Sequence, residues 1–207
     1  MDLGEQLTKR YMTQLVATPE GRAHVLHQCA EAEDSDEAQV FDRVLAVIED
    51  PELAQLVKRH KADETRHAAM FRERLAATGV TPPPIPDELR LLARIDRALG
   101  GARPVTDRTG VMEAYVLLQV IEERATTQFG IHEAVFRRID PKTADVYAAI
   151  AKDEARHLKY CHAIGRRYAP DEATYLATVR GYRKIEARAF AANGRANMRY
   201  VFANDYI

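Results

Sequence analysis

The sequence has little net charge and no long apolar run. Its formal net charge is −1, from 30 Lys and Arg residues against 31 Asp and Glu residues, so it has no net field to attract nucleic acid or an anionic membrane surface. No apolar run approaches the roughly 20 residues of a membrane-spanning helix, and Met1 to Glu5 lack the basic and then apolar layout of a signal peptide. We therefore expect a cytoplasmic protein with no nucleic-acid partner and no membrane partner.

Cysteine is also scarce. Cys29 and Cys161 are the only two cysteines, and they do not form a Cys-x-x-Cys pair. This spacing argues against a rubredoxin-type iron site and against a disulfide framework, so we expect two buried free thiols. With 207 residues, 46% of them hydrophobic, the chain can bury one substantial core. We expect a single domain over residues 1–207.

The pattern of apolar residues is helical along most of the chain, and no segment shows the alternation typical of a strand. The proline-rich stretch 82–86 cannot continue a helix, because proline removes backbone donors and fixes the backbone dihedral angles. The tail after Asn193 has no clear pattern. The expected helices cover about 3–17, 20–49, 51–78, 87–99, 107–138, 141–168 and 170–192.

The connections between the expected helices predict their arrangement. Tight Asp-Pro turns at Asp50-Pro51 and Asp140-Pro141 indicate two antiparallel hairpins. The segment from about 79 to 106 separates these hairpins and is long enough to run the length of a bundle. We therefore expect an all-α four-helix bundle with its core at about 20–168, an extra N-terminal helix, and a C-terminal helical extension at about 170–207.

One short motif occurs twice. Asp63-Glu64-Thr65-Arg66-His67 returns as Asp153-Glu154-Ala155-Arg156-His157, offset by 90 residues, and each copy lies 13 residues after the aspartate of an Asp-Pro turn. Residues three apart share a helix face, so each copy directs one carboxylate and one imidazole the same way. Two such helices that face each other could hold metal ions.

Helical phase places both motifs on buried faces. A carboxylate and an imidazole on a buried face need a partner, and a metal ion is the economical one because no matching cations are present. A surface helix with salt bridges such as Asp63 to Arg66 is the alternative interpretation. At 100° per residue, Glu64 shares a stripe with Leu53, Val57, His60, Phe71 and Leu75, and Glu154 shares one with Tyr147, Ile150 and Cys161.

The other two helices of the bundle should each supply a carboxylate. Glu122 lies on the apolar face of its helix, whereas Glu123 is rotated by 100° toward solvent, so Glu122 is the expected ligand. In the first helix, phase favours Glu33 and Glu37 over Glu31. Glu33 precedes Glu64 by 31 residues, close to the 32 residues between Glu122 and Glu154. We therefore choose Glu33 and keep Glu37 as the alternative.

Four carboxylates and two histidines in the order Glu, Glu-x-x-His, Glu, Glu-x-x-His resemble the ferritin-like di-iron carboxylate superfamily, most closely its rubrerythrin, aldehyde-deformylating oxygenase and acyl-carrier-protein desaturase branches. The resemblance covers about residues 20–168. It implies a ferritin-like bundle with two iron ions, and the oxygen-rich ligands also suit manganese. By the same resemblance, Asp63 would fix His157 and Asp153 would fix His67. The implied ligands are Glu64 and Glu154, shared between the ions, His67 and His157, one for each ion, and the terminal Glu33 and Glu122.

The resemblance leaves two kinds of function open. The first is an oxidoreductase that activates dioxygen to oxidise a small organic or lipid-like substrate, with an unidentified electron donor and a homodimeric assembly. The alternative is a ferroxidase, a peroxide scavenger or another iron-handling protein. A helical interaction module without metal would have to bury acidic side chains at high cost.

Three further features have open roles. Tyr115 and Tyr147 each lie seven residues before an expected ligand, where they could transfer electrons, but packing explains them better. Apolar residues near the motifs, such as Phe71, Phe129 and Leu118, could line a substrate channel, but they too are more typical of a core. The C-terminal segment is rich in basic residues, which could bind an anion or simply form a solvated face: Arg180, Arg183, Lys184, Arg188, Arg195 and Arg199.

Overall fold

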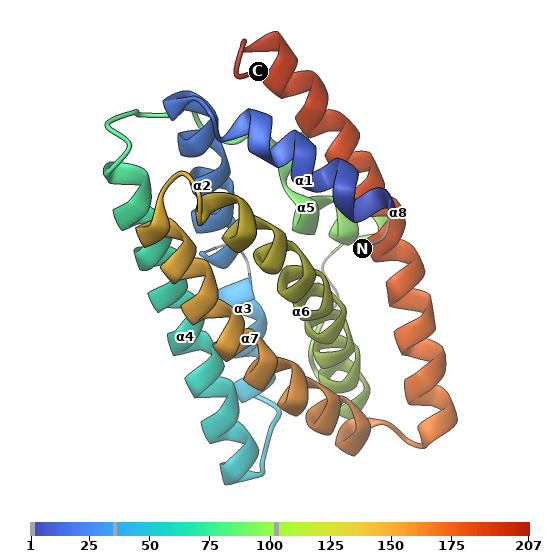
Figure 1. Cartoon of the computed structure of the whole chain (residues 1–207). Helices are drawn as coiled ribbons and strands as arrows, with labels where there is room; N and C mark the ends of the chain where they lie inside the picture. The colour runs from blue at the N-terminus through green and yellow to red at the C-terminus, as the bar shows by residue number, and fades with distance from the viewer. Residues whose placement is uncertain (1–2, 35–36, 102–103) are drawn as a thin grey trace.

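The computed structural model describes residues 3–34, 37–101 and 104–207, and every regular element within these ranges is a helix. This confirms the predicted all-α class. None of the described helices combines the length and the apolarity that a membrane crossing requires. The elements are α1 (Leu3–Leu15), α2 (Pro19–Glu33), α3 (Glu37–Leu45), α4 (Pro51–Ala76), the 3-10 helix η1 (Asp87–Leu89), α5 (Leu91–Ala98), α6 (Arg108–Phe136), α7 (Pro141–Tyr168) and α8 (Glu172–Ala203), shown in Figure 1.

Aspartate side chains begin the long helices. Asp50 accepts hydrogen bonds from the backbone N–H groups of Glu52 and Leu53, and Asp140 accepts one from that of Thr143. A proline follows each of these two aspartates at the first helical position, where its missing N–H costs nothing. The two Asp-Pro starts therefore place the repeated motif at the same distance from the beginning of α4 and α7.

The helix expected at 20–49 is divided into two. Helix α2 ends at Glu33, where the N–H of the capping residue Asp34 bonds the carbonyl oxygen of Ala30, and α3 begins at Glu37. Asp34 favours this helix end, because a short polar side chain competes for backbone hydrogen bonds. Glu33 consequently lies at a helix end and not in the middle of a long helix.

Helix α8 extends beyond the predicted end near 192. It passes through Asn193 and Gly194 and ends at Ala203. Tertiary contacts explain the extension: Val201 is buried, and the amide of Gln28 in α2 donates to Asn197 Oδ1 at 2.7 Å. Packing therefore outweighs the weak helix propensity of the Asn-Gly pair.

Two ion pairs join α8 to α6. Arg124 donates from Nε and Nη2 to the two carboxylate oxygens of Glu186, at 2.8 and 2.9 Å, and Glu186 is buried. Arg183 donates in the same forked manner to Glu123 nearer the surface. Such paired hydrogen bonds fix orientation as well as distance. Glu186 therefore belongs to the interface with α6.

Four helices surround the interior. Helix α2 packs against α4, α6 packs against α7, and α4 also contacts α7, while α1 and α8 contact α6 from outside (Figure 1). The segment between α4 and α6 carries η1 and α5, and both lie against α8. Of the three apolar clusters among the described residues, the two larger ones include Phe41, Val57 and Tyr115 in one and Phe71 and Tyr147 in the other. The repeated motif projects into this interior from α4 and α7.

The cap at the start of α7 provides a first test. Asp140 accepts from Thr143 and forms an ion pair with Arg74, at 2.8 Å between Nη2 and Oδ2. We expect Asp140→Ala to lower the free energy of unfolding by about 1–2 kcal/mol. Asp140→Asn should retain most of the cap and lose the ion pair. Urea unfolding measured by circular dichroism gives both values, and an unchanged Asp140→Ala protein would contradict this role.

The same residue has a defined pH dependence. Burial raises the pKa of the Asp140 carboxyl, but hydrogen bonds from Thr143 and Arg74 outweigh burial and lower the pKa below its ordinary value. Its charge-dependent stabilisation is therefore complete above the unfolded pKa of about 3.9 and is lost as the pH falls through the lower folded pKa. The difference in unfolding free energy between wild type and Asp140→Asn should shrink over this acidic range.

Candidate metal centre

Helices α2, α4, α6 and α7 bring seven potential metal ligands into one buried space. All six ligands expected from the sequence are among them, and the seventh is His60. The seven residues form two sets of four that share Glu64. Within each set, every residue offers one ligand atom, and these atoms all lie within 4.8 Å of one another. The first group, called the Glu33 position below, consists of Glu33, Glu64, His67 and Glu154, and the second, called the His60 position, consists of His60, Glu64, Glu122 and His157.

In the Glu33 position, three carboxylates surround one imidazole. His67 Nδ1 lies 3.4 Å from Glu33 Oε2, 3.3 Å from Glu154 Oε1 and 3.9 Å from Glu64 Oε2. The His67 side chain is fully buried, and Glu33 is 9% exposed. Glu33 is also the last residue of α2, where the helix dipole disfavours a negative charge. A cation at this point would compensate both the dipole and the crowded carboxylates.

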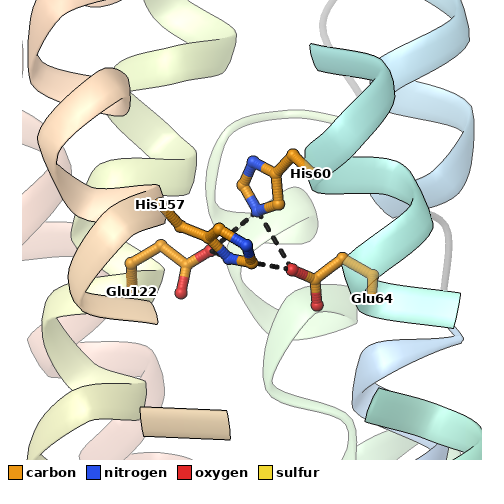
Figure 2. Close-up of side chains that lie close together, drawn as sticks. All are labelled: His60, Glu64, Glu122 and His157. Carbon is orange, nitrogen blue, oxygen red and sulfur yellow. Dashed lines mark hydrogen bonds and ion pairs between the residues drawn. The ribbon is translucent and has the colours of Figure 1, made fainter. Parts of the chain in front are cut away.

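The His60 position contains two imidazoles and two carboxylates, which come from three helices and point toward one another (Figure 2). His60 Nε2 lies 3.0 Å from Glu64 Oε1 and 3.0 Å from Glu122 Oε1. His157 Nδ1 lies 3.2 Å from the same Glu64 oxygen and 3.7 Å from Glu122 Oε1. Four donor atoms therefore converge on one centre.

Glu64 and Glu154 each reach both positions. Glu64 directs Oε1 toward His60 and His157 and Oε2 toward His67. Glu154 directs Oε1 toward His67, at 3.3 Å, and Oε2 toward His157, at 3.0 Å. Each carboxylate thus presents one oxygen atom to each side. This is the arrangement needed to bridge two ions.

Several donor atoms point at common centres and not at hydrogen-bond partners. Glu64 Oε1 and His67 Nδ1 are buried and have no well-aligned hydrogen-bond partner among the described residues, although imidazole and carboxylate atoms lie 3.0–3.9 Å away. Buried polar atoms almost always have a partner. A cation held between the donor atoms would supply the missing partner for both, so the residues fit metal ions.

The charge of the centre also fits metal ions. Its four carboxylates balance two divalent cations. Without them, burial raises the pKa of Glu122 well above its ordinary value, and the charge of Glu154 adds to the rise. Burial lowers the pKa of His157, but the neighbouring carboxylates of Glu122, Glu154 and Glu64 outweigh it and raise the pKa to about 12. The metal-free centre thus retains protons, which metal ions would displace.

The aspartate of each motif crosses to the histidine of the other. Asp63 Oδ2 lies 3.2 Å from His157 Nε2, and Asp153 Oδ2 lies 3.3 Å from His67 Nε2. Because the outer nitrogen is engaged in this way, Nδ1 of each ring faces the carboxylates. This fixes the tautomer and orientation that a metal-binding imidazole requires. The crossed pairing expected from the sequence is therefore present.

The same aspartates also form salt bridges. Arg66 binds Asp63 and Asp153, and Arg156 binds both aspartates as well, each at 2.7 Å. Burial raises the pKa of Asp63, but Arg66, His157 and Arg156 outweigh it and bring the pKa to about 2. The aspartates therefore stay ionised, and two arginines neutralise them. The salt bridges and the hydrogen bonds that orient the two histidines therefore form one network.

Two other carboxylates that the sequence raised as candidates, Glu123 and Glu31, do not enter either group. Glu123 faces Arg183 and Gln119, as expected for the residue rotated away from the interior. Glu31 lies beside Arg90 on the far side of α2. The side chain of Glu37, the alternative to Glu33, lies outside the described residues, so only Glu33 can be placed.

The expected packing residues lie in the core. Tyr115 and Tyr147 are fully buried. Phe71 and Phe129 stack around Tyr147, with ring centroids 5.1 and 5.5 Å away. Cys161 is buried and Cys29 is half-buried, and both are free thiols. Cys29 Sγ lies 3.4 Å from the hydroxyl of Tyr147.

His60 is the candidate ligand that sequence reasoning missed. Its position four residues before Glu64 places it on the ligand face of α4, and the phase analysis already put it in the buried stripe. Periodicity alone gives it no role beyond marking that stripe. A fully buried imidazole beside two carboxylates is a third candidate histidine ligand.

Comparison of the chain with protein-family models, curated proteins and solved structures finds no match. The case for a metal centre therefore depends on the geometry and chemistry of the side chains described above.

Metal content tests the ligand assignment. Because Glu64 serves both positions, Glu64→Gln should lose most of the metal, whereas Glu33→Gln and Glu122→Gln should each lose about one of two ions. Glu123→Gln is the matched control, since it alters the neighbouring carboxylate that faces Arg183. Elemental analysis after reconstitution with Fe²⁺ measures the content. Equal metal in wild type and Glu64→Gln would exclude this centre.

The crossed aspartates give a second test. We expect Asp63→Asn and Asp153→Asn to weaken metal binding by about 10- to 100-fold, because the outer hydrogen bond of each histidine loses its charged acceptor. Asp145→Asn in α7 is the control, because Asp145 is exposed and pairs with Arg137 away from the centre. Competition with a coloured chelator measures the affinities. If the three variants weaken binding equally, the aspartates do not support the ligands.

Proposed function

We propose that the chain is a non-haem oxidoreductase that holds two iron ions, or a manganese and an iron ion, and uses dioxygen to oxidise a small organic or lipid-like substrate. The observation that carries the proposal is the pair of buried ligand groups joined by Glu64. Oxygen-rich ligation with some imidazole suits iron and manganese better than copper, which prefers softer or more nitrogenous ligands.

We further propose that the fold is a ferritin-like four-helix bundle. In this arrangement, α2 with α4 and α6 with α7 are the two hairpins, and the segment that carries η1 and α5 is the long crossover. The packing of α2 on α4 and of α6 on α7 supports this arrangement. So does the internal repeat, because a twofold relation between the hairpins brings both Glu-x-x-His pairs to one centre.

The side chains around the centre would hold the ions and limit the access of water. When bound, ferrous ions supply the electrons and the open coordination positions that dioxygen reduction requires. Asp63 and Asp153 would keep His67 and His157 in the ligating tautomer. Glu64 is only 6% exposed, and such a dry site strengthens every charge interaction inside it.

An external electron source belongs to this proposal, because repeated reduction of dioxygen consumes more electrons than two ferrous ions store. A cleft on the described surface has a volume of about 570 Å³, and Asp50, Asp107, Arg167 and Tyr168 contribute to its lining. None of the ligand candidates lines it. We therefore do not assign the substrate to this cleft.

Dioxygen uptake tests the function. The ferrous protein should consume dioxygen, and Glu64→Gln and the metal-free protein should not. Addition of a panel of aldehydes, fatty acids and arylamines should accelerate uptake for at least one class and yield an oxidised product by mass spectrometry. Growth of a ferric mineral without any organic acceleration would instead support iron handling. A protein that binds two irons and consumes no dioxygen would contradict both functions.

A further inference from the structure

The two metal positions are chemically unlike. Both contain Glu64, both receive an oxygen of Glu154, and each has one further carboxylate and one histidine of the repeated motif. Only the His60 position has a second imidazole, with His60 Nε2 3.0 Å from Glu64 and 3.0 Å from Glu122. The His60 position therefore has one more nitrogen donor than the Glu33 position, whether or not Glu154 is counted as a ligand of both positions.

The difference is built into the repeat. His60 precedes Glu64 by four residues in α4, and the residue four before Glu154 in α7 is Ile150. Ile150 is fully buried in the apolar cluster that includes Leu26 and Phe71. At equivalent points of the duplicated motif, one copy thus carries a nitrogen ligand and the other carries an aliphatic side chain. The asymmetry follows from one residue pair and not from a local distortion.

His60 is also held differently from the other two histidines. Its Nδ1 has no hydrogen-bond partner among the described residues, whereas the outer nitrogens of His67 and His157 meet aspartates. Aromatic packing orients the ring, with Phe41 at 4.6 Å and His157 at 4.0 Å between centroids. His60 is therefore a ring-packed candidate ligand that offers the His60 position a nitrogen donor and no additional carboxylate.

Imidazole favours the later divalent transition metals over manganese more strongly than carboxylate does. From this we infer that His60 makes the two positions selective for different ions. The His60 position binds the later transition-metal ion first, such as Fe²⁺ or its stand-in Co²⁺. The Glu33 position accepts the harder, oxygen-preferring ion, Mn²⁺. The inference deepens the proposed function, because it rests on the metal centre of that proposal and states which side of the centre discriminates between metals.

Mixed reconstitution tests the inference. Metal-free protein would receive one equivalent of Co²⁺, an air-stable stand-in for Fe²⁺, with about a tenfold excess of Mn²⁺. Elemental analysis should find about one Co and one Mn per chain, and anomalous diffraction at the two absorption edges should place Co at the His60 position. Cobalt spread equally over the two positions, or located at the Glu33 position, would overturn the inference.

Two variants exchange the asymmetric pair. His60→Ile copies the second repeat, so the Co preference of its position should disappear and the two positions should take the ions in equal ratio. Ile150→His copies the first repeat, and Co should then compete with Mn at both positions. If His60→Ile does not fold, the wild-type diffraction and Ile150→His still decide. An unchanged Co distribution in a folded His60→Ile protein would show that His60 is not the cause.

The outcomes also separate the inference from the proposed function. A wild-type protein that binds neither ion would remove the metal centre and the inference together. Two bound ions with no positional preference would remove the inference alone and leave dioxygen chemistry open. A clear preference without dioxygen uptake would retain the inference and remove the oxidase.

Discussion

Four carboxylates lie together in one largely buried space of this protein. Two like charges 4 Å apart repel by about 4 kcal/mol even at an effective dielectric constant of 20, so a few such pairs would match the whole free energy of unfolding of a typical domain, about 5–15 kcal/mol. The centre therefore needs bound cations or retained protons. Where no cation is bound, protons must compensate the carboxylate charge, and the pKa values of Glu122 and His157 are raised for this reason.

The layer outside the carboxylates is neutral and joins the two halves of the repeat. Asp63 and Asp153 each meet both Arg66 and Arg156, so two negative charges face two positive charges and no further charge is added to the centre. The crossed hydrogen bonds to the histidines link α4 to α7 at the level of the ligands. One network thus orients the imidazoles and fixes how these two helices face each other.

Much of this could be predicted from the sequence because helical phase and the Asp-Pro caps act locally. Phase alone separated Glu122 from Glu123, and spacing favoured Glu33. Long-range packing decided the features that were missed: the buried contacts of Asn197 carry α8 past Asn193. Local pattern also failed at His60, since periodicity identifies a buried face and does not tell a packing residue from a candidate ligand on it. Only the distances of His60 to Glu64 and Glu122 identify it as a candidate ligand.

The asymmetry of the centre coincides with an asymmetry of the fold. Helix α6 runs unbroken past Glu122, whereas its counterpart ends at Glu33 and resumes as α3. Helix α3 then packs Phe41 on the ring of His60. A strictly duplicated bundle would place equivalent ligands in equivalent surroundings. Here, one side of the centre has an imidazole that packs on an aromatic ring, whereas on the other side a helix ends at the residue that carries the carboxylate. Since a fold does not determine a reaction, such departures from symmetry are where the chemistry of this centre is specified.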